Sequence, residues 1–291
     1  MRGAPSSASI RLILKCLPIA IICSIILGPL LLTLIVSFWS KKGFGMEVDF
    51  SLKSYQIFFW GPRFEVFERS LWVSMSSTAI MLLIAYPVAY IVATRVREDL
   101  TRFVLLLFAA PFLVNYILRT FAWAEILSRS GPVNQVLVSI GFTQKPVDWL
   151  LYSDFAVYLG LITAYMPFMI FPIWLSLFGI ERRFIEASWM LGVAPWQTFW
   201  SVTLPLSMPG VIAAAIFGFV GAFGEVAVSL ILGGTGYQLL GNAITSALDV
   251  INFPLAAAIS SVATGVMLAL LLLWYCVFDI RLLLGKIIGR N

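Results

Sequence analysis

The stretch ERRFIEASWMLGVAPWQTFWSVTLP, residues 181–205, lies between two long apolar runs and is itself half polar and half aromatic. Its first part, 182–191, contains neither proline nor glycine and can form a short helix. Gly192 then permits a chain reversal that a residue with a Cβ atom resists. A second short segment, 196–203, leads to Leu204-Pro205, where a new helix can begin. The pattern predicts a helix–glycine–helix hairpin beside a membrane, with an interfacial loop carrying a tryptophan belt as the alternative.

The composition indicates that most of the chain lies in a membrane. Of its 291 residues, 61% are hydrophobic and only 11% are charged, whereas soluble domains carry about 25% charged residues. Because unpaired backbone groups are costly in lipid, we expect apolar segments of this kind to cross the membrane as α-helices. We therefore predict an all-α integral membrane protein.

The residue types also exclude several kinds of chemistry. The chain contains no histidine, which removes imidazole as a general base or metal ligand and excludes His-dependent catalytic sets. Its cysteines, Cys16, Cys23 and Cys276, lie in apolar stretches without a CxxC pair, so we predict neither a metal site nor a disulfide. A GxxxxGK[ST] phosphate loop is absent from the sequence. We predict no enzymatic activity and no cofactor, and we expect a partner chain to supply the energy.

Six segments of the sequence are apolar and long enough to cross a bilayer, which requires about 20 residues. They comprise residues 12–39, 70–94, 103–127, 155–179, 207–232 and 256–278. The first run is too long for the apolar part of a cleaved signal peptide, so we expect it to be a retained helix.

The distribution of Lys and Arg indicates the orientation. These residues are more numerous on the side that carries the N-terminus, and the loops on that side are shorter and more densely charged. We predict a cytoplasmic N-terminus (1–11), a first transmembrane helix (12–39), a periplasmic loop (40–69), a five-helix core (70–278) and a cytoplasmic tail (279–291). The 181–205 stretch then lies in the cytoplasm, and Arg119 belongs to the outer side.

The spacing within residues 181–205 resembles the EAA motif of ABC-importer permeases, which reads E-A-A, three residues, G, nine residues, I, one residue, L-P. The matching positions are Glu186, Ala187, Ser188, Gly192, Val202, Leu204 and Pro205, with Ser188 in place of Ala and Val202 in place of Ile. In that family the segment is a coupling helix that docks on a cytoplasmic ATPase. The resemblance implies the same coupling role for these residues.

Other parts of the chain are similar to permeases of the spermidine/putrescine type. They are SLKSYQIFF (51–59), YPVAYIVA (86–93), PFLVNYILRTFAWAEIL (111–127), GPVNQVL (131–137), YMPFMIFPIW (165–174) and LLGNAI (239–244). This resemblance implies a six-helix type I importer fold in the bacterial cell inner membrane and a small, polyamine-like organic cation as substrate. It also implies a second homologous permease, two copies of an ATPase and a periplasmic solute-binding protein as partners.

The substrate class is less specific than the family. The stretch GEVAVSLILGG, residues 224–234, is also similar to a segment of molybdate and sulfate permeases. Permeases of the polyamine type further include importers of opine-like compounds and amino-acid derivatives. An oxyanion and an opine or amino-acid derivative are therefore alternative substrates.

Glu225 is the one carboxylate deep inside a predicted span. Intramembrane carboxylates are costly and face the interior of a helix bundle. Gly218, Gly221 and Ala222 precede it on the same helix face, where small residues let another backbone approach closely. Glu225 is either a gate or cation-attracting group in the transport path, or a structural carboxyl that is hydrogen-bonded across helices. An ion-coupled carrier or channel that uses Glu225 is the alternative from another functional class.

Three further residues are candidates for the transport path. Trp123 and Tyr165 could stack on an alkylammonium group, although aromatic residues near the ends of spans also form interfacial belts. Asp249 could give a cationic substrate an acidic mouth together with the outer-loop residues Asp148 and Asp154. The alternative for all three carboxylates is simple solvation.

Overall fold

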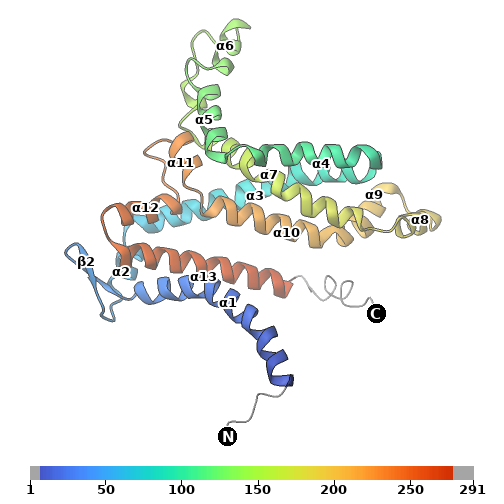
Figure 1. Ribbon diagram of the computed structural model, residues 1–291. Helices are drawn as coiled ribbons and strands as arrows, with labels where there is room; N and C mark the ends of the chain where they lie inside the picture. The colour runs from blue at the N-terminus through green and yellow to red at the C-terminus, as the bar shows by residue number, and fades with distance from the viewer. Residues whose placement is uncertain (1–6, 278–291) are drawn as a thin grey trace. The chain divides into compact units, whose positions relative to one another are not determined.

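The computed structural model describes residues 7–277. The chain is helical apart from one short antiparallel hairpin, in which Ser40 pairs with Glu47. In chain order the elements are α1 (Ser7–Val36), β1 (Ser40–Lys42), β2 (Gly45–Glu47), α2 (Lys53–Phe59), α3 (Pro62–Thr94), α4 (Glu98–Leu113), α5 (Tyr116–Leu127), α6 (Pro132–Ser139), the 3-10 turn η1 (Asp148–Leu150), α7 (Asp154–Phe178), α8 (Arg182–Met190), α9 (Pro195–Thr198), the π-helical turn η2 (Phe199–Thr203), α10 (Leu204–Phe223), α11 (Ala227–Leu232), α12 (Leu240–Asp249) and α13 (Phe253–Val277). Figure 1 shows these elements along the chain.

Four of the described helical segments are long and apolar enough to cross a membrane: Pro62–Thr94, Asp148–Phe178, Pro195–Phe223 and Phe253–Trp274. They overlap four of the six predicted spans, 70–94, 155–179, 207–232 and 256–278. Within the first predicted span, the part Ile21–Val36 forms a shorter apolar helix. The prediction of an all-helical membrane protein is therefore confirmed. The predicted N-terminal and C-terminal segments, 1–11 and 279–291, lie largely or wholly outside the described residues.

The predicted third span, 103–127, is not one helix. It is divided into α4, which ends at Leu113, and α5, which begins at Tyr116. Asn115 has a non-helical backbone, with ψ of 130°, and its side-chain oxygen accepts a hydrogen bond from the Ile117 amide at 2.9 Å. Asparagine is among the residues that best satisfy the free N–H groups at the start of a helix. The break therefore has a local cause within an otherwise apolar run.

The predicted fifth span, 207–232, is also interrupted. α10 ends at Phe223 and α11 begins at Ala227, so Glu225 lies in the break and not inside a continuous helix. Gly224 follows α10 directly and begins the break.

The compact part of the chain that holds these breaks is built on α3, α7 and α10, which lie side by side in Figure 1. α10 approaches α7 closely through its small residues, as predicted. A Cβ atom added to Gly218 would come within 2.6 Å of the Met169 sulfur, and one added to Gly221 would come within 2.4 Å of the Tyr165 ring. Small residues stabilise helix pairs in lipid because backbones can approach and gain van der Waals contact.

A cluster of fully or nearly fully buried residues joins α3, α7 and α10. Its members are Met81, Ala85, Ala89, Met169, Ile170, Ile173, Leu177 and Ala214. A second cluster, centred on Val157, Leu161, Val228 and Leu232, packs α7 against α11. Large apolar side chains on the outer faces, such as Leu83 and Leu106, remain exposed, which is the arrangement expected of helices that face lipid.

The described chain divides into two compact units. One comprises Glu65–Asn242 together with the described residues from Met267 onward. The other comprises the described residues up to Phe64 together with Ala243–Val266. In the latter unit, the Ser37 and Tyr55 hydroxyl oxygens lie 2.7 Å apart, and the Phe38 ring stacks on Phe50 at 5.2 Å. Lys41 Nζ donates to the Val250 carbonyl at 2.8 Å, which ties the β-hairpin to the end of α12.

Candidate functional site

The stretch from Glu181 to Pro205 forms the hairpin that its sequence predicts. α8 covers Arg182–Met190, and the chain reverses at Gly192, whose φ is +76°. A Cβ atom on Gly192 would meet no atom within 4 Å, so glycine is required for its backbone conformation and not for lack of space. The prediction of a short helix followed by a glycine turn is confirmed.

The two arms of this hairpin are joined by a buried hydrogen bond. The Ser188 and Thr198 hydroxyl oxygens lie 2.9 Å apart, and the two residues are 8% and 2% exposed. Ser188 is the position at which the sequence carries Ser in place of the second Ala of the EAA motif. Sequence analysis did not identify Thr198 as its partner.

The tip of the hairpin is apolar and exposed. Met190 and Leu191 are 89% and 82% exposed, and the neighbouring Trp196 is 66% exposed. Among the motif residues, Glu186, Ala187, Gly192 and Pro205 are exposed, Leu204 is half-buried and Ser188 is buried. Exposed apolar groups of this size on one short hairpin are typical of a protein or membrane contact surface.

The second arm of the hairpin runs into α10 without a break. α10 begins at Leu204 with Pro205 in its first turn, as predicted, but the chain before it is already helical, because Thr203 and Leu204 both have helical backbone angles and η2 joins α9 to α10. Proline lacks an N–H group and cannot complete the regular ladder, and the widened π-helical turn ends at Thr203, two residues before Pro205. Short π-helical turns of this kind occur often at functional sites.

The hairpin also packs against α3. The Phe199 ring contacts Tyr86 and Tyr90 edge-on, with centroids 5.8 Å and 5.7 Å away. Tyr86 also places its hydroxyl 2.9 Å from Ser207 Oγ at the start of α10. A displacement of the hairpin would therefore be transmitted to two transmembrane helices through packed aromatic rings.

Glu225 is buried, at 4% exposure, and both of its carboxylate oxygens have partners. Oε1 accepts from the backbone amides of Val226, Ala227 and Val228 at 3.1, 2.9 and 3.2 Å, so the side chain caps α11. Oε2 accepts from the Tyr165 hydroxyl on α7. The geometry brings together two residues that sequence analysis proposed separately for the transport path.

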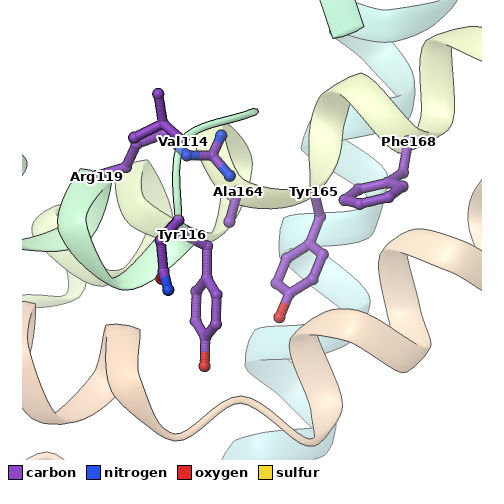
Figure 2. A pocket seen from close by; sticks show the side chains of 7 residues that line it. Val114, Tyr116, Arg119, Ala164, Tyr165 and Phe168 are labelled. Carbon is purple, nitrogen blue, oxygen red and sulfur yellow. The ribbon is translucent and has the colours of Figure 1, made fainter. Parts of the chain in front are cut away.

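A cavity of about 390 Å³ lies beside the middle of α7. Its walls are the chain around the α4–α5 break and one face of α7, namely Val114, Asn115, Tyr116, Arg119, Ala164, Tyr165 and Phe168 (Figure 2). Tyr165 therefore lines a cavity as well as bonding Glu225. Glu225 is not one of the lining residues.

The other proposed path residues lie elsewhere. Trp123 is half-buried on α5 and packs against the cluster around Leu161, and it does not line the cavity. Asp249 is exposed at the end of α12 and belongs to the other compact unit. Within residues 7–277, no group of three or more Cys, Asp or Glu side chains is placed to hold a metal ion.

Asp154, predicted for an acidic mouth, is engaged in a cluster. Its Oδ1 accepts from the Tyr237 hydroxyl at 2.8 Å and from Arg69 Nη2 at 3.2 Å. The Arg69 guanidinium also lies 3.9 Å from the centre of the Tyr237 ring. Burial, followed by the bond to Asp154, raises the pKa of Tyr237 above its usual value. The cluster connects α3, α7 and the α11–α12 loop.

Comparison with known proteins identifies the family. Residues 81–281 match the family described as "Binding-protein-dependent transport system inner membrane component". The chain belongs to this family. It is therefore a multi-pass inner-membrane permease, a transport subunit without catalytic activity of its own.

Two curated relatives of this permease share the name "Spermidine/putrescine transport system permease protein PotB". The protein from Haemophilus influenzae is 32% identical over 252 residues, which cover 86% of this chain and 87% of that protein. The protein from Escherichia coli K12 is 30% identical over 231 residues, which cover 79% and 83%.

A solved structure supports the fold of the permease. A chain of a bacterial alginate ABC transporter, in complex with a periplasmic protein that carries an alginate pentasaccharide, aligns with a TM-score of 0.69 and 18% identity. The alignment covers 90% of the permease and 91% of that chain. At this identity the likeness concerns the fold alone.

Two polar features of the site were missed in the sequence. Arg119 was counted on the outer side, but the structure places it beside the middle of α7. Asn115 was read as one residue of a continuous span, although an asparagine within an apolar run is a recognisable sign of a helix start.

Proposed function

We propose that this permease is the membrane-spanning subunit of an ATP-driven importer and that it moves a small organic amine of the polyamine type. It crosses the inner membrane six times with both termini in the cytoplasm. Its partners are a second homologous permease, two copies of a cytoplasmic ATPase and a periplasmic solute-binding protein.

The exposed hairpin carries the proposal for the coupling role. Glu186, Ala187, Ser188, Gly192, Leu204 and Pro205 form or flank it, and its tip presents Met190, Leu191 and Trp196 to a partner. An ATPase that grips this tip can move the hairpin as one piece, because the Ser188–Thr198 bond joins its two arms. Phe199 then conveys the movement to α3, and η2 conveys it to α10.

This movement alternates the access of the transport path. ATP binding closes the two ATPases and opens the path toward the binding protein, which releases its solute. Hydrolysis then restores the inward-facing state. The permease contributes the moving helices and the walls of the path, and its partner supplies the energy.

The names of the curated relatives support an amine as substrate. The cavity beside α7 is compatible with an amine, because the rings of Tyr116 and Tyr165 line it and aromatic faces attract alkylammonium groups. Tyr165 is thus a wall of the proposed path, and Glu225 acts on the path through its bond to Tyr165. Trp123 and Asp249 remain proposed members of the path outside this cavity.

The alternative of an ion-coupled carrier is less well supported. Such a carrier would need Glu225 to exchange a proton or cation, yet both of its oxygens are held by Tyr165 and by the start of α11. Membership of a binding-protein-dependent family also favours a system with separate binding and energy-supplying subunits.

The experiment is to purify the complex through a tag on this permease. Two quantities are measured: the amount of ATPase that is retained, and the increase in its rate of ATP hydrolysis when the binding protein is added. Gly192→Val is expected to abolish stimulation and to lower ATPase retention, with the permease still in the membrane. Gly141→Val is a matched control, because Gly141 also has a positive φ, +75°, and open space around its Cβ position. Retention and stimulation that are normal in Gly192→Val would refute the coupling role.

A further inference from the structure

The cavity beside α7 contains a charged group without a counter-ion. Arg119 is one of its lining residues and takes part in none of the ion pairs among the described residues. Its Nε atom is buried without a hydrogen-bond partner, and its Nη1 makes one long contact, 3.4 Å, to the Thr163 carbonyl. A guanidinium group has five N–H donors. The four on the two Nη atoms make only this one long contact, so most of their donor capacity is available to a molecule in the cavity.

The position of Arg119 makes this charge unusual. The lining residues Ala164, Tyr165 and Phe168 lie halfway along α7, which is long and apolar enough to cross the membrane. Charged side chains at this depth are costly and mark the pathways of substrates or ions. An arginine at a membrane surface would need no such explanation.

The backbone adds to the positive potential at the same place. The cavity wall includes Asn115 and Tyr116, where α5 begins, and Arg119 lies in the first turn of that helix. The start of a helix carries a partial positive charge. In secondary transporters, the starts of broken membrane helices commonly face anionic groups of substrates near the midplane. The other broken helix, α11, already has an anionic partner at its start, the carboxylate of Glu225.

The opposite side of the cavity has a different chemistry. In Figure 2 the hydroxyl groups of Tyr116 and Tyr165 point away from the Arg119 guanidinium, which lies beside Ala164. The Tyr165 hydroxyl continues to Glu225. The cavity thus has a cationic side and an aromatic side that is connected to a carboxylate. Such a polarity fits a solute with a negative group at one end and an ammonium group at the other.

We propose that Arg119 binds a carboxylate in this cavity, so that the transported solute is a small amino carboxylate and not a bare polyamine. The carboxylate lies against Arg119 and the start of α5, and the ammonium group lies against the Tyr116 and Tyr165 rings. This inference rests on the proposed function for the importer role, and it replaces the polyamine with an amino carboxylate as the substrate class.

The test compares solutes that differ only at one end. Putrescine and 4-aminobutanoate share a four-carbon skeleton and one ammonium group, and cadaverine and 5-aminopentanoate are the corresponding five-carbon pair. Initial rates of labelled uptake are measured in proteoliposomes that contain the whole complex and its binding protein, together with ATP hydrolysis. The variants are Arg119→Gln, Arg119→Lys and the control Arg129→Gln, whose exposed side chain instead pairs with Asp148 at 3.4 Å.

We expect uptake of the amino carboxylates by the wild-type complex. Arg119→Gln should reduce it about 10-fold to 100-fold, the range for loss of hydrogen bonds to a charged group. Arg119→Lys should keep part of the rate, because the charge remains without the planar fork, and Arg129→Gln should be unaffected. The ratio of diamine to amino-carboxylate uptake should rise in Arg119→Gln, which a purely structural role would not produce.

Two kinds of failure can be separated. Uptake of diamines alone, or an equal loss of both solute classes in Arg119→Gln, would overturn the carboxylate site and leave the proposed importer intact. If none of the four solutes increases ATP hydrolysis in the presence of the binding protein, the proposed function fails, and the inference fails with it.

Discussion

The hydroxyl oxygens of Ser188 and Thr198 lie 2.9 Å apart across the α8–α9 hairpin, and both side chains are buried. The bond holds the two arms together at the point where the EAA motif has Ala and this chain has Ser. Replacing one partner leaves the other hydroxyl buried without a partner, which costs about 1–3 kcal/mol, whereas replacing both by apolar groups can be nearly neutral.

Single variants at this pair should therefore be less stable than the double variant. Ser188→Ala and Thr198→Val are each expected to lower the thermal stability of the purified complex and its stimulated ATP hydrolysis. The combination Ser188→Ala/Thr198→Val should recover most of both. A double-mutant cycle of melting temperatures measures the coupling. Strictly additive effects would show that the two hydroxyl groups do not depend on each other.

The capping of α11 by Glu225 predicts an order among its variants. Glu225→Ala removes the acceptor for three backbone amides and for Tyr165, and loss of a helix cap costs up to about 2 kcal/mol. Glu225→Gln retains a carbonyl oxygen that accepts from the amides, and it has an NH₂ group that can donate a hydrogen bond to the Tyr165 oxygen. Glu225→Asp is one methylene shorter and cannot reach both sets of partners.

Stability and initial uptake should therefore decrease from Gln to Asp to Ala at this position. Uptake in proteoliposomes and thermal unfolding of the complex provide the measurements. Asp retaining more uptake than Gln would instead show that the negative charge of Glu225 acts on the substrate.

The predicted sidedness can be tested with two matched glutamines. Gln197 lies exposed in the hairpin and Gln144 lies exposed in the loop after α6. In a variant with Cys16, Cys23 and Cys276 replaced by Ala, Gln197→Cys should react with a membrane-impermeant thiol reagent only from the cytoplasmic side. Gln144→Cys should react only from the periplasmic side. The opposite pattern would reverse the topology.

The cluster of Tyr237, Asp154 and Arg69 predicts a dependence on alkaline pH. Burial and the bond to Asp154 raise the pKa of Tyr237 in the folded chain, whereas the unfolded value is about 10. Above pH about 10 the unfolded chain loses this proton first, so stability falls as the pH rises. The contribution is fully present at neutral pH.

The melting temperature of the complex should therefore decrease between pH about 9.5 and 11. Tyr237→Phe lacks the titrating hydroxyl, so its decrease should be smaller than that of the wild-type chain. Equal decreases in the two proteins would mean that Tyr237 contributes nothing to the alkaline loss.

Local signals explain the features that were predicted well. The length of an apolar run reports whether a helix can cross a membrane, and four described helices agree with such runs. The turn between the two short helices needs a residue with a left-handed backbone conformation. Gly192, whose φ is +76°, marks this turn in the sequence. Small residues at helical spacing, Gly218 and Gly221, correctly indicated where α10 approaches a neighbour.

The breaks in the helices were within reach of the sequence but were overlooked. Asn115 caps α5 with its own side chain, and Glu225 caps α11 in a comparable way. In both cases a polar residue inside an apolar run satisfies free backbone amides. Hydrophobicity averaged over a long window does not register a single capping residue, so both segments were read as continuous helices.

The sequence by itself determined the membrane class, the position of most spans and the α8–α9 hairpin, because each depends on residues that are neighbours along the chain. Only the tertiary structure decided which polar groups meet. Tyr165 and Glu225 are 60 residues apart in the chain, and they meet because α10 packs closely on α7 and then breaks. Arg119 reaches a cavity beside the middle of α7 because α5 begins anew at Tyr116. Such contacts depend on how helices pack and where they are interrupted, and composition and periodicity along one helix carry no information about its partner.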